Sequence, residues 1–203
     1  MANNSSNKRN RVRIIGGEWR SRVLQFPDAP DLRPTPDRVR ETLFNWLQFS
    51  VVGMRCLDLF AGSGALGFEA LSRGAAAVTA LETDTAAASA LRANAGLLGT
   101  DKMQVIQQDA VRWLSQPATQ QFDLVLLDPP FAANLHEHCC GLLQQHGWLA
   151  PAARIYMEAG QSLASFKLPA GWLLDRHKQA GDVHYGLVLV RNVSNPQKLK
   201  QPD

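Results

Sequence analysis

Four consecutive residues have the types and the order needed to hold a planar amine. Asp128, Pro129, Pro130 and Phe131 follow the apolar run FDLVLL. Two prolines restrict the backbone and remove two N–H donors, so carbonyl oxygens and the Asp128 carboxylate remain as acceptors. Oxygen acceptors that form hydrogen bonds with the N–H groups of an aromatic amine direct its nitrogen lone pair at an electrophile. Phe131 offers a ring on which a base can stack. The alternative is a strand-ending turn with a core Phe.

A glycine-rich loop, AGSGALG, comes earlier in the chain. Gly62, Gly64 and Gly67 follow an apolar run and open a helical stretch. Glycines there let the backbone approach a ligand closely, and the start of a helix offers free N–H groups. Glu82 ends the next apolar run, where it can accept hydrogen bonds from ribose hydroxyls. The loop and the acid together predict a cofactor that contains a nucleoside.

Two further acids favour one cofactor class over another. Asp58 precedes the glycine loop, where a carboxylate can face the ammonium group of S-adenosylmethionine but would repel a pyrophosphate. Asp109 ends the third apolar run and can accept a hydrogen bond from an adenine amino group. Each has a structural alternative, because Asp58 can cap the loop and Asp109 can begin the next helix. The glycine loop by itself is also compatible with a nicotinamide-dependent oxidoreductase.

Together these motifs predict methyl transfer to an exocyclic amine of a base. The methyl group of a sulfonium is already activated, so the protein mainly has to hold nitrogen, carbon and sulfur in line. The same turn can hold any planar amine, which leaves adenine N6 in DNA or RNA, guanine and protein glutamine as acceptors. A nucleic-acid-binding module with a vestigial cofactor site is a third alternative.

The elements that must position these residues follow an α/β pattern. Short apolar runs alternate with helical stretches from Arg55 onward, as in βαβ units. We expect a Rossmann-like, mostly parallel seven-stranded sheet whose last strand is antiparallel. Five strands are predicted at 55–60, 78–82, 104–107, 122–127 and 154–158, and helices at 65–73, 85–97, 110–115 and 133–145. A final antiparallel hairpin joins LLDRHKQ to HYGLVLVR around AGDV.

An N-terminal β-hairpin and a helix precede the sheet. RVRII and EWRSRVL predict two short strands around a two-residue turn at Gly16-Gly17. Thr35 and Pro36 predict the N-cap and first residue of a helix that runs to about Gln48. Its apolar stripe consists of Val39, Leu43, Phe44 and Leu47. We expect a disordered basic tail at 1–10, an RNA-binding appendage at 11–50, a methyltransferase domain at 51–191 and a flexible tail at 192–203.

The positive charge is concentrated at the N-terminal end. The chain of 203 residues has a net charge of +3, yet the segment from Met1 to Arg40 contains nine Lys or Arg against four acids. A basic arm on a near-neutral body is typical of a polyanion binder, although a solvated tail gives the same count.

Cysteine usage and hydropathy favour a cytoplasmic protein without metal. The three cysteines include no C-x-x-C spacing, and no run approaches 18 apolar residues. His136, His138, Cys139 and Cys140 cannot share one helical face, so no metal site is predicted, and the histidines are expected at or near the surface.

The motifs RIIGGEWRSR, LRPTPDRVRETLFNWL, LDLFAGSGALGFEALSRGA and LLDPPF resemble class I methyltransferases that use S-adenosylmethionine, and within them the ribosomal RNA small subunit methyltransferase D family. The resemblance covers about residues 11–191. It implies methylation of guanine N2 in small-subunit (16S) ribosomal RNA, free or within an assembling small subunit, by a monomer.

The resemblance also implies roles for individual residues. Those that hold the cofactor would be Asp58, Phe60, Gly62, Gly64, Glu82, Asp109 and Ala110. The guanine amine would be oriented by Asp128, Pro129, Pro130 and Phe131. RNA phosphates would be bound by Arg11, Arg13, Arg20, Arg22, Arg33, Arg38 and Arg40.

Overall fold

The structure, a computed structural model, describes residues 10–28 and 32–191. Its described residues form two compact units, which divide between Ala110 and Val111. Apart from Asn10, which begins the first strand, the two predicted tails lie outside the described residues. The predicted division into an appendage and a methyltransferase domain near residue 50 stays a prediction.

The main sheet has seven strands. In the first unit their order is β5 (Met103–Gln107), β4 (Ala77–Glu82) and β3 (Arg55–Asp58), and in the second unit it is β6 (Phe122–Leu127), β7 (Leu149–Ala159), β9 (Val183–Val190) and β8 (Trp172–Ala180). The pairings within each unit are parallel except those of β9, the last strand in the sequence, which is antiparallel to both β7 and β8. The prediction of a mostly parallel seven-stranded sheet with an antiparallel last strand and an N-terminal hairpin is therefore confirmed.

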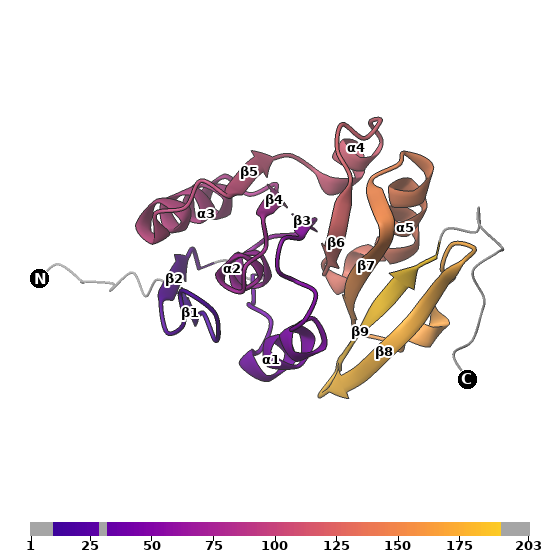
Figure 1. The fold of residues 1–203 in the computed structure, drawn as a ribbon, viewed down its shortest axis with the longest axis horizontal. Helices are drawn as coiled ribbons and strands as arrows, with labels where there is room; N and C mark the ends of the chain where they lie inside the picture. The colour runs from indigo at the N-terminus through magenta and orange to yellow at the C-terminus, as the bar shows by residue number, and fades with distance from the viewer. Residues whose placement is uncertain (1–9, 29–31, 192–203) are drawn as a thin grey trace, which may run out of the picture. The chain divides into compact units, whose positions relative to one another are not determined.

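Three parallel strands form the sheet of the first unit: β3 (Arg55–Asp58), β4 (Ala77–Glu82) and β5 (Met103–Gln107). The helices α2 (Ala65–Ser72) and α3 (Thr85–Leu98) pack on these strands (Figure 1). Most of β4 is buried, as expected for a central strand of a parallel sheet.

The N-terminal hairpin of the first unit differs from the prediction. Its strands are β1 (Asn10–Arg13) and β2 (Val23–Phe26), which pair antiparallel and are joined by residues 14–22. The expected two-residue turn at Gly16-Gly17 is therefore wrong, and Arg20 and Arg22 lie in the connection. The backbone of this connection bonds to α2 instead of closing a tight turn.

Helix α1 (Asp37–Trp46) carries the predicted apolar stripe on its buried face. Val39, Leu43 and Phe44 are fully buried, as is Leu47 just beyond the helix. The helix begins and ends slightly inside the predicted bounds. Pro36 is its N-cap residue, so the prediction that Thr35 caps it is wrong.

The second unit contains the remaining strands and helices. Helix α4 (Ala110–Leu114) begins at the boundary, and β6 (Phe122–Leu127) pairs in parallel with β7 (Leu149–Ala159). The other elements are η1 (Phe131–Ala133), α5 (His136–Gln145), η2 (Leu163–Ser165), β8 (Trp172–Ala180) and β9 (Val183–Val190). Strand β7 begins earlier than the predicted 154–158, and Pro151 lies within it.

Trp148 anchors the core of the second unit. Its indole Nε1 donates to the Leu114 carbonyl oxygen over 2.9 Å, and its ring stacks on that of Trp113 at 3.9 Å between centroids.

Within residues 10–28 and 32–191, every helix is too short or too polar to cross a membrane.

Candidate active site

The carboxyl ends of the parallel strands in the first unit place three acids along one edge of the sheet. Asp58 ends β3 in register with Ala80, and Glu82 ends β4 in register with Gln107. Asp109 follows β5 two residues after Gln107. Ligands of open α/β sheets bind at this edge, so the register brings together the acids that the sequence singled out.

The glycine loop between β3 and α2 has a backbone shape that requires glycine. Gly62 and Gly64 have φ angles of 50° and 77°, and the Gly64 N–H donates to the Ala61 carbonyl oxygen over 2.7 Å. Gly64 is the N-cap residue of α2, and a Cβ there would lie 2.5 Å from Leu91 Cδ2. The loop therefore combines left-handed backbone with close packing, which no other residue type permits.

Glu82 holds the loop through its carboxylate. Oε2 accepts from the Gly62 N–H and Oε1 accepts from the Asp84 N–H, each over 2.8 Å. A carboxylate has about four lone-pair positions, so both oxygens can still accept hydrogen bonds from ribose hydroxyls. The side chain is half-buried, which leaves it accessible from the edge of the sheet.

The remaining predicted cofactor residues fit S-adenosylmethionine by their chemistry. Asp58 is only 3% exposed and can offer a charged partner to an ammonium group. Asp109 is exposed and can accept from an amino group, Phe60 is half-buried, and Ala110 is buried. These residues supply the acceptors and the apolar contacts that an adenosine and an amino-acid moiety need.

The motif Asp128 to Phe131 ends β6 in the second unit. Asp128 is half-buried, Pro129 is buried and Pro130 is exposed. Phe131 begins the short helix η1 and is 44% exposed. A Cβ on Gly160 would lie 3.1 Å from Phe131 Cδ2, so the ring packs directly on the backbone after β7. The ring is thus supported by the protein and still offers surface to a ligand.

A buried polar pair in β7 accompanies this motif, and sequence reasoning missed it. The Tyr156 hydroxyl donates to Glu158 Oε1 over 2.8 Å. Burial, together with the negative charges of Glu158 and Asp128, raises the pKa of Tyr156 well above its ordinary value. Tyr156 therefore stays a neutral donor. The only signal in the sequence was a Tyr and a Glu in the short segment IYMEA.

His136 is buried, which contradicts its predicted position at the surface. Its Nε2 lies 2.6 Å from the Glu158 carbonyl oxygen, and its ring packs against Phe166. Burial lowers the pKa of His136, and the hydrogen bond to that carbonyl opposes the shift in part. The imidazole therefore acts as a neutral donor.

The neighbouring cysteines are also buried. Burial, together with the charges of Cys139 and Glu137, raises the pKa of Cys140 to about 12, so its thiol is not a nucleophile at neutral pH. In the part of the chain that the structure describes, His, Cys, Asp and Glu side chains form no group of three or more that could hold a metal ion.

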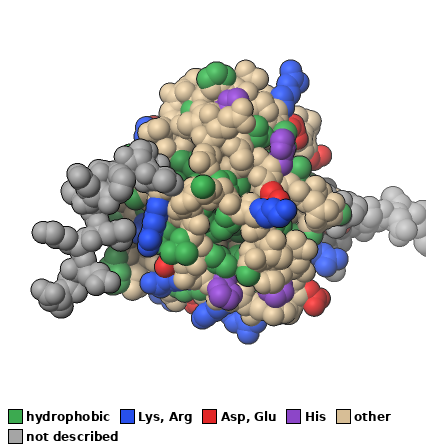
Figure 2. Space-filling view, turned by 90° about the vertical axis from the view of Figure 1, so that its right-hand side faces the viewer, with side chains coloured by type: hydrophobic (Ala, Val, Ile, Leu, Met, Phe, Trp, Pro, Cys, Tyr) green, Lys and Arg blue, Asp and Glu red, His purple; other side chains and the backbone are tan. Residues whose placement is uncertain are grey.

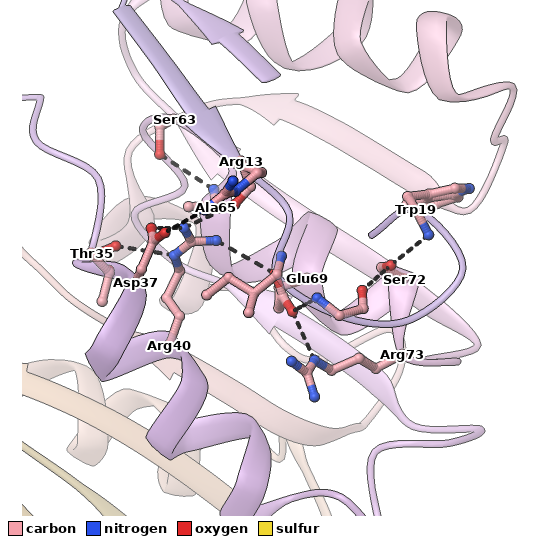
Figure 3. Close-up of polar contacts among 12 residues, drawn as sticks. Arg13, Trp19, Thr35, Asp37, Arg40, Ser63, Ala65, Glu69, Ser72 and Arg73 are labelled. Atoms are coloured by element: carbon pink, nitrogen blue, oxygen red, sulfur yellow. Dashed lines mark hydrogen bonds and ion pairs between the residues drawn. The ribbon is translucent and has the colours of Figure 1, made fainter. Parts of the chain in front are cut away.

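The predicted RNA-binding arginines fall into two groups. The exposed ones are Arg11, Arg13, Arg20, Arg22, Arg33 and Arg38. Arg40 is fully buried: its Nη2 donates to Asp37 Oδ1 over 2.6 Å and to the Arg13 carbonyl oxygen over 3.0 Å, as Figure 3 shows. This contradicts the prediction that Arg40 binds RNA phosphates, because its guanidinium is shielded from solvent and bonded within the protein.

Comparison with known proteins identifies the family. The family model "Conserved hypothetical protein 95" matches residues 12–189. Ribosomal RNA small subunit methyltransferase D of Escherichia coli K12 is 49% identical over 176 residues, which cover 87% of this chain and 88% of the relative. The enzyme of the same name from Haemophilus influenzae is 46% identical over 184 residues, 89% of this chain and 95% of the relative.

Solved structures agree with this assignment. A putative methyltransferase from Escherichia coli superposes with a TM-score of 0.82 at 44% identity, over 90% of this chain and 99% of the other. A putative methylase from Haemophilus influenzae gives 0.78 at 44% identity, over 90% and 100% of the two chains. The chain therefore belongs to the family of the ribosomal RNA small subunit methyltransferases D.

Proposed function

We propose that this chain transfers a methyl group from S-adenosylmethionine to the exocyclic N2 amino group of a guanine in small-subunit ribosomal RNA. The observation that carries the proposal is the glycine loop tied to Glu82 at the sheet edge, in a chain that is 49% identical to a ribosomal RNA methyltransferase. A nicotinamide-dependent oxidoreductase, the alternative that the glycine loop allowed, has no support from these relatives.

The cofactor supplies an activated methyl group, and the residues of the first unit bind it. Asp58 would pair with the methionyl ammonium, Glu82 with the ribose hydroxyls and Asp109 with the adenine amino group. Phe60 and Ala110 would contact the adenosine, while Gly62 and Gly64 let the backbone approach it closely.

The residues of the second unit would orient the acceptor. The Asp128 carboxylate and a proline carbonyl oxygen would accept hydrogen bonds from the two N–H groups of the guanine amine. These hydrogen bonds would direct the nitrogen lone pair at the methyl group. Phe131, supported from behind by Gly160, would stack on the base. As the nitrogen takes the methyl group, the C–S bond of the cofactor would break, and the cationic nitrogen would then release its proton to water, so the reaction needs orientation more than a strong base.

The RNA would be held by exposed arginines of the N-terminal segment. Figure 2 shows one face of the molecule, on which Lys and Arg side chains stand in several separate groups and not in one continuous patch. The phosphate contacts would therefore come from the exposed arginines of the hairpin and of α1. We propose a monomer that acts in the cytoplasm on ribosomal RNA, free or in an assembling small subunit.

Mass spectrometry of nucleosides from small-subunit ribosomal RNA tests the proposal. Cells that lack the gene should lose one N2-methylguanosine, and purified protein with S-adenosylmethionine should restore it to that RNA. A missing N6-methyladenosine would instead identify adenine as the acceptor. Unchanged nucleosides together with zero methyl incorporation would favour a binding module with a vestigial cofactor site.

A further inference from the structure

Helix α2 carries the glycine loop at one end and contacts the basic N-terminal segment near its other end. Gly64 caps its start, and its eight residues span about 12 Å. Glu69 and Ser72, in the second half of the helix, bind the backbone of residues 15–19, which we call the docking segment (Figure 3). One short helix therefore connects the cofactor loop to the segment that leads into the exposed arginines.

Glu69 is the first of the two contacts. Its side chain is fully buried, and its carboxylate accepts from the Ile15 N–H over 2.8 Å and from the Gly16 N–H over 2.9 Å. It is also paired with Arg73 Nε over 2.8 Å and with Arg40 Nη1 over 3.5 Å. A buried carboxylate with four donors holds the docking segment through charge-assisted hydrogen bonds, which are stronger than neutral ones.

Ser72 is the second contact, and it explains the glycine at position 17. Its hydroxyl donates to the Gly16 carbonyl oxygen over 2.6 Å and accepts from the Trp19 N–H over 2.9 Å, while its own carbonyl oxygen accepts from the Glu18 N–H over 2.7 Å. Gly17 has a φ of 77°, and a Cβ there would lie 1.8 Å from the Ser72 carbonyl oxygen. The docking segment thus approaches α2 more closely than any side chain allows.

The chain that follows the docking segment is also held in place. The Ile14 N–H donates to the Arg22 carbonyl oxygen and the Ser21 N–H donates to the Ile14 carbonyl oxygen, each over 2.9 Å. Arg20 and Arg22 therefore lie in a closed loop fixed at its base, with both side chains exposed, and Arg22 Nη2 also donates to the Leu97 carbonyl oxygen over 3.1 Å. A loop that is already fixed in the free protein lowers the conformational-entropy cost of RNA binding.

We propose that Glu69 and Ser72 are positioning residues for RNA binding. They fix the docking segment on α2, and the fixed segment presents Arg20 and Arg22 to RNA phosphates. The inference rests on the proposed function and adds to it the element that sets RNA affinity. It predicts that undocking the segment weakens RNA binding and leaves the cofactor site intact.

Gly17→Ala tests this, with Gly53→Ala as the matched control. The two glycines have φ angles of 77° and 79°, so alanine is strained equally at both positions. A Cβ on Gly53 meets nothing within 4 Å, whereas a Cβ on Gly17 meets the backbone of α2. The difference between the two variants therefore reports the close approach and not the backbone strain.

The probe is an unmodified transcript of small-subunit ribosomal RNA. For Gly17→Ala, the Kd for this RNA should rise about tenfold, because two long arginine side chains lose their fixed base. The slope of log K against log salt should fall by up to about two units if both phosphate contacts are lost. The Kd for S-adenosylmethionine should change less than about twofold, because the variant leaves the cofactor site intact. Hydrogen exchange at the amides of Glu18 and Trp19 should accelerate, whereas Gly53→Ala should match the wild type in all four measurements.

Ser72→Ala keeps the inference testable if Gly17→Ala fails to fold. It removes two hydrogen bonds without steric conflict and should raise the RNA Kd in the same direction by about threefold. The inference is overturned if the folded variants bind RNA like Gly53→Ala, with the same salt slope. A wild-type protein that binds the transcript but never methylates it would contradict the proposed function instead, and the comparison of RNA affinities would still stand.

Discussion

The Gly62 N–H donates a hydrogen bond to Glu82 Oε2 over 2.8 Å, which joins the glycine loop to the end of the neighbouring strand. The other carboxylate oxygen accepts from the Asp84 N–H, just before α3. Glu82 thus fixes the backbone on both sides of the cofactor edge before any ribose binds. The spacing between a glycine loop and the next acid has a direct structural reason here, because the acid shapes the loop.

Replacing Glu82 should therefore weaken cofactor binding more than it slows the chemical step. Glu82→Ala removes the hydrogen bonds to the Gly62 and Asp84 N–H groups as well as the ribose acceptors. Charge-assisted bonds of this kind are each worth about 1.5–3 kcal/mol. The KM for S-adenosylmethionine should rise about tenfold or more by that estimate, with a smaller fall in kcat. Glu82→Gln keeps one oxygen acceptor and should be intermediate. Steady-state kinetics with both variants measure this, and a larger effect on kcat than on KM would contradict ribose binding.

Asp128 should act on turnover and not on cofactor binding. Asp128→Ala removes the acceptor that orients the amine, and misorientation of a reacting group costs about 100-fold or more in rate. Single-turnover methylation and calorimetric titration with S-adenosylmethionine separate the two effects. Asp182→Ala, in the exposed turn between β8 and β9, is the control and should leave both unchanged. If Asp128→Ala lost cofactor affinity and turnover together, its assigned role would be wrong.

Arg38 and Arg40 lie two residues apart in α1, yet replacing them with alanine should have opposite effects on RNA binding and on the free energy of unfolding. Arg38 is exposed, so Arg38→Ala should weaken RNA binding and leave the free energy of unfolding almost unchanged. Arg40→Ala removes a buried partner of Glu69, and breaking a buried ion pair costs about 3 kcal/mol or more. Urea unfolding and RNA titration of both variants measure the contrast. An Arg40→Ala protein of normal stability with weakened RNA binding would restore the role that its burial argues against.

Periodicity predicted most of the sheet because its strands are formed by local apolar runs between turn residues. The edge of acids was also predictable, since parallel strands align their carboxyl ends. The hairpin was not, because Gly16 and Gly17 satisfy the local rule for a tight turn and the contacts that override it come from Glu69 and Ser72, more than fifty residues away.

The burial of polar side chains could likewise not be predicted from the sequence. Arg40 counted as one more positive charge of the basic segment, but its guanidinium is paired with the buried Glu69 and bonded to Asp37 and to the Arg13 carbonyl oxygen. His136 lies among polar residues in the sequence, yet the Glu158 carbonyl oxygen gives it a partner that compensates its burial. Glu69 lies 29 residues from Arg40 and Glu158 lies 22 residues from His136, and composition and spacing do not contain such distant partners.

The buried His136 should make stability depend on pH. Burial lowers its pKa below the ordinary value of 6.5, so the folded protein favours the neutral ring. As the pH falls below 6.5, the unfolded chain takes up a proton first, and the free energy of unfolding decreases until the pH reaches the lowered pKa of the folded state. The contribution of His136 is thus complete above the unfolded value and is lost on acidification.

Urea unfolding at about pH 7.5 and pH 5.5, on either side of the ordinary histidine pKa, measures this contribution. His136→Gln should be less stable than the wild type at the higher pH, because it loses the packed ring and its hydrogen bond to Glu158, and it should lose less stability on acidification. His138→Gln changes an exposed histidine of the same helix and should keep the wild-type dependence. Equal losses in the wild type and His136→Gln would mean that other groups cause the acid sensitivity, since only a titrating residue changes the slope.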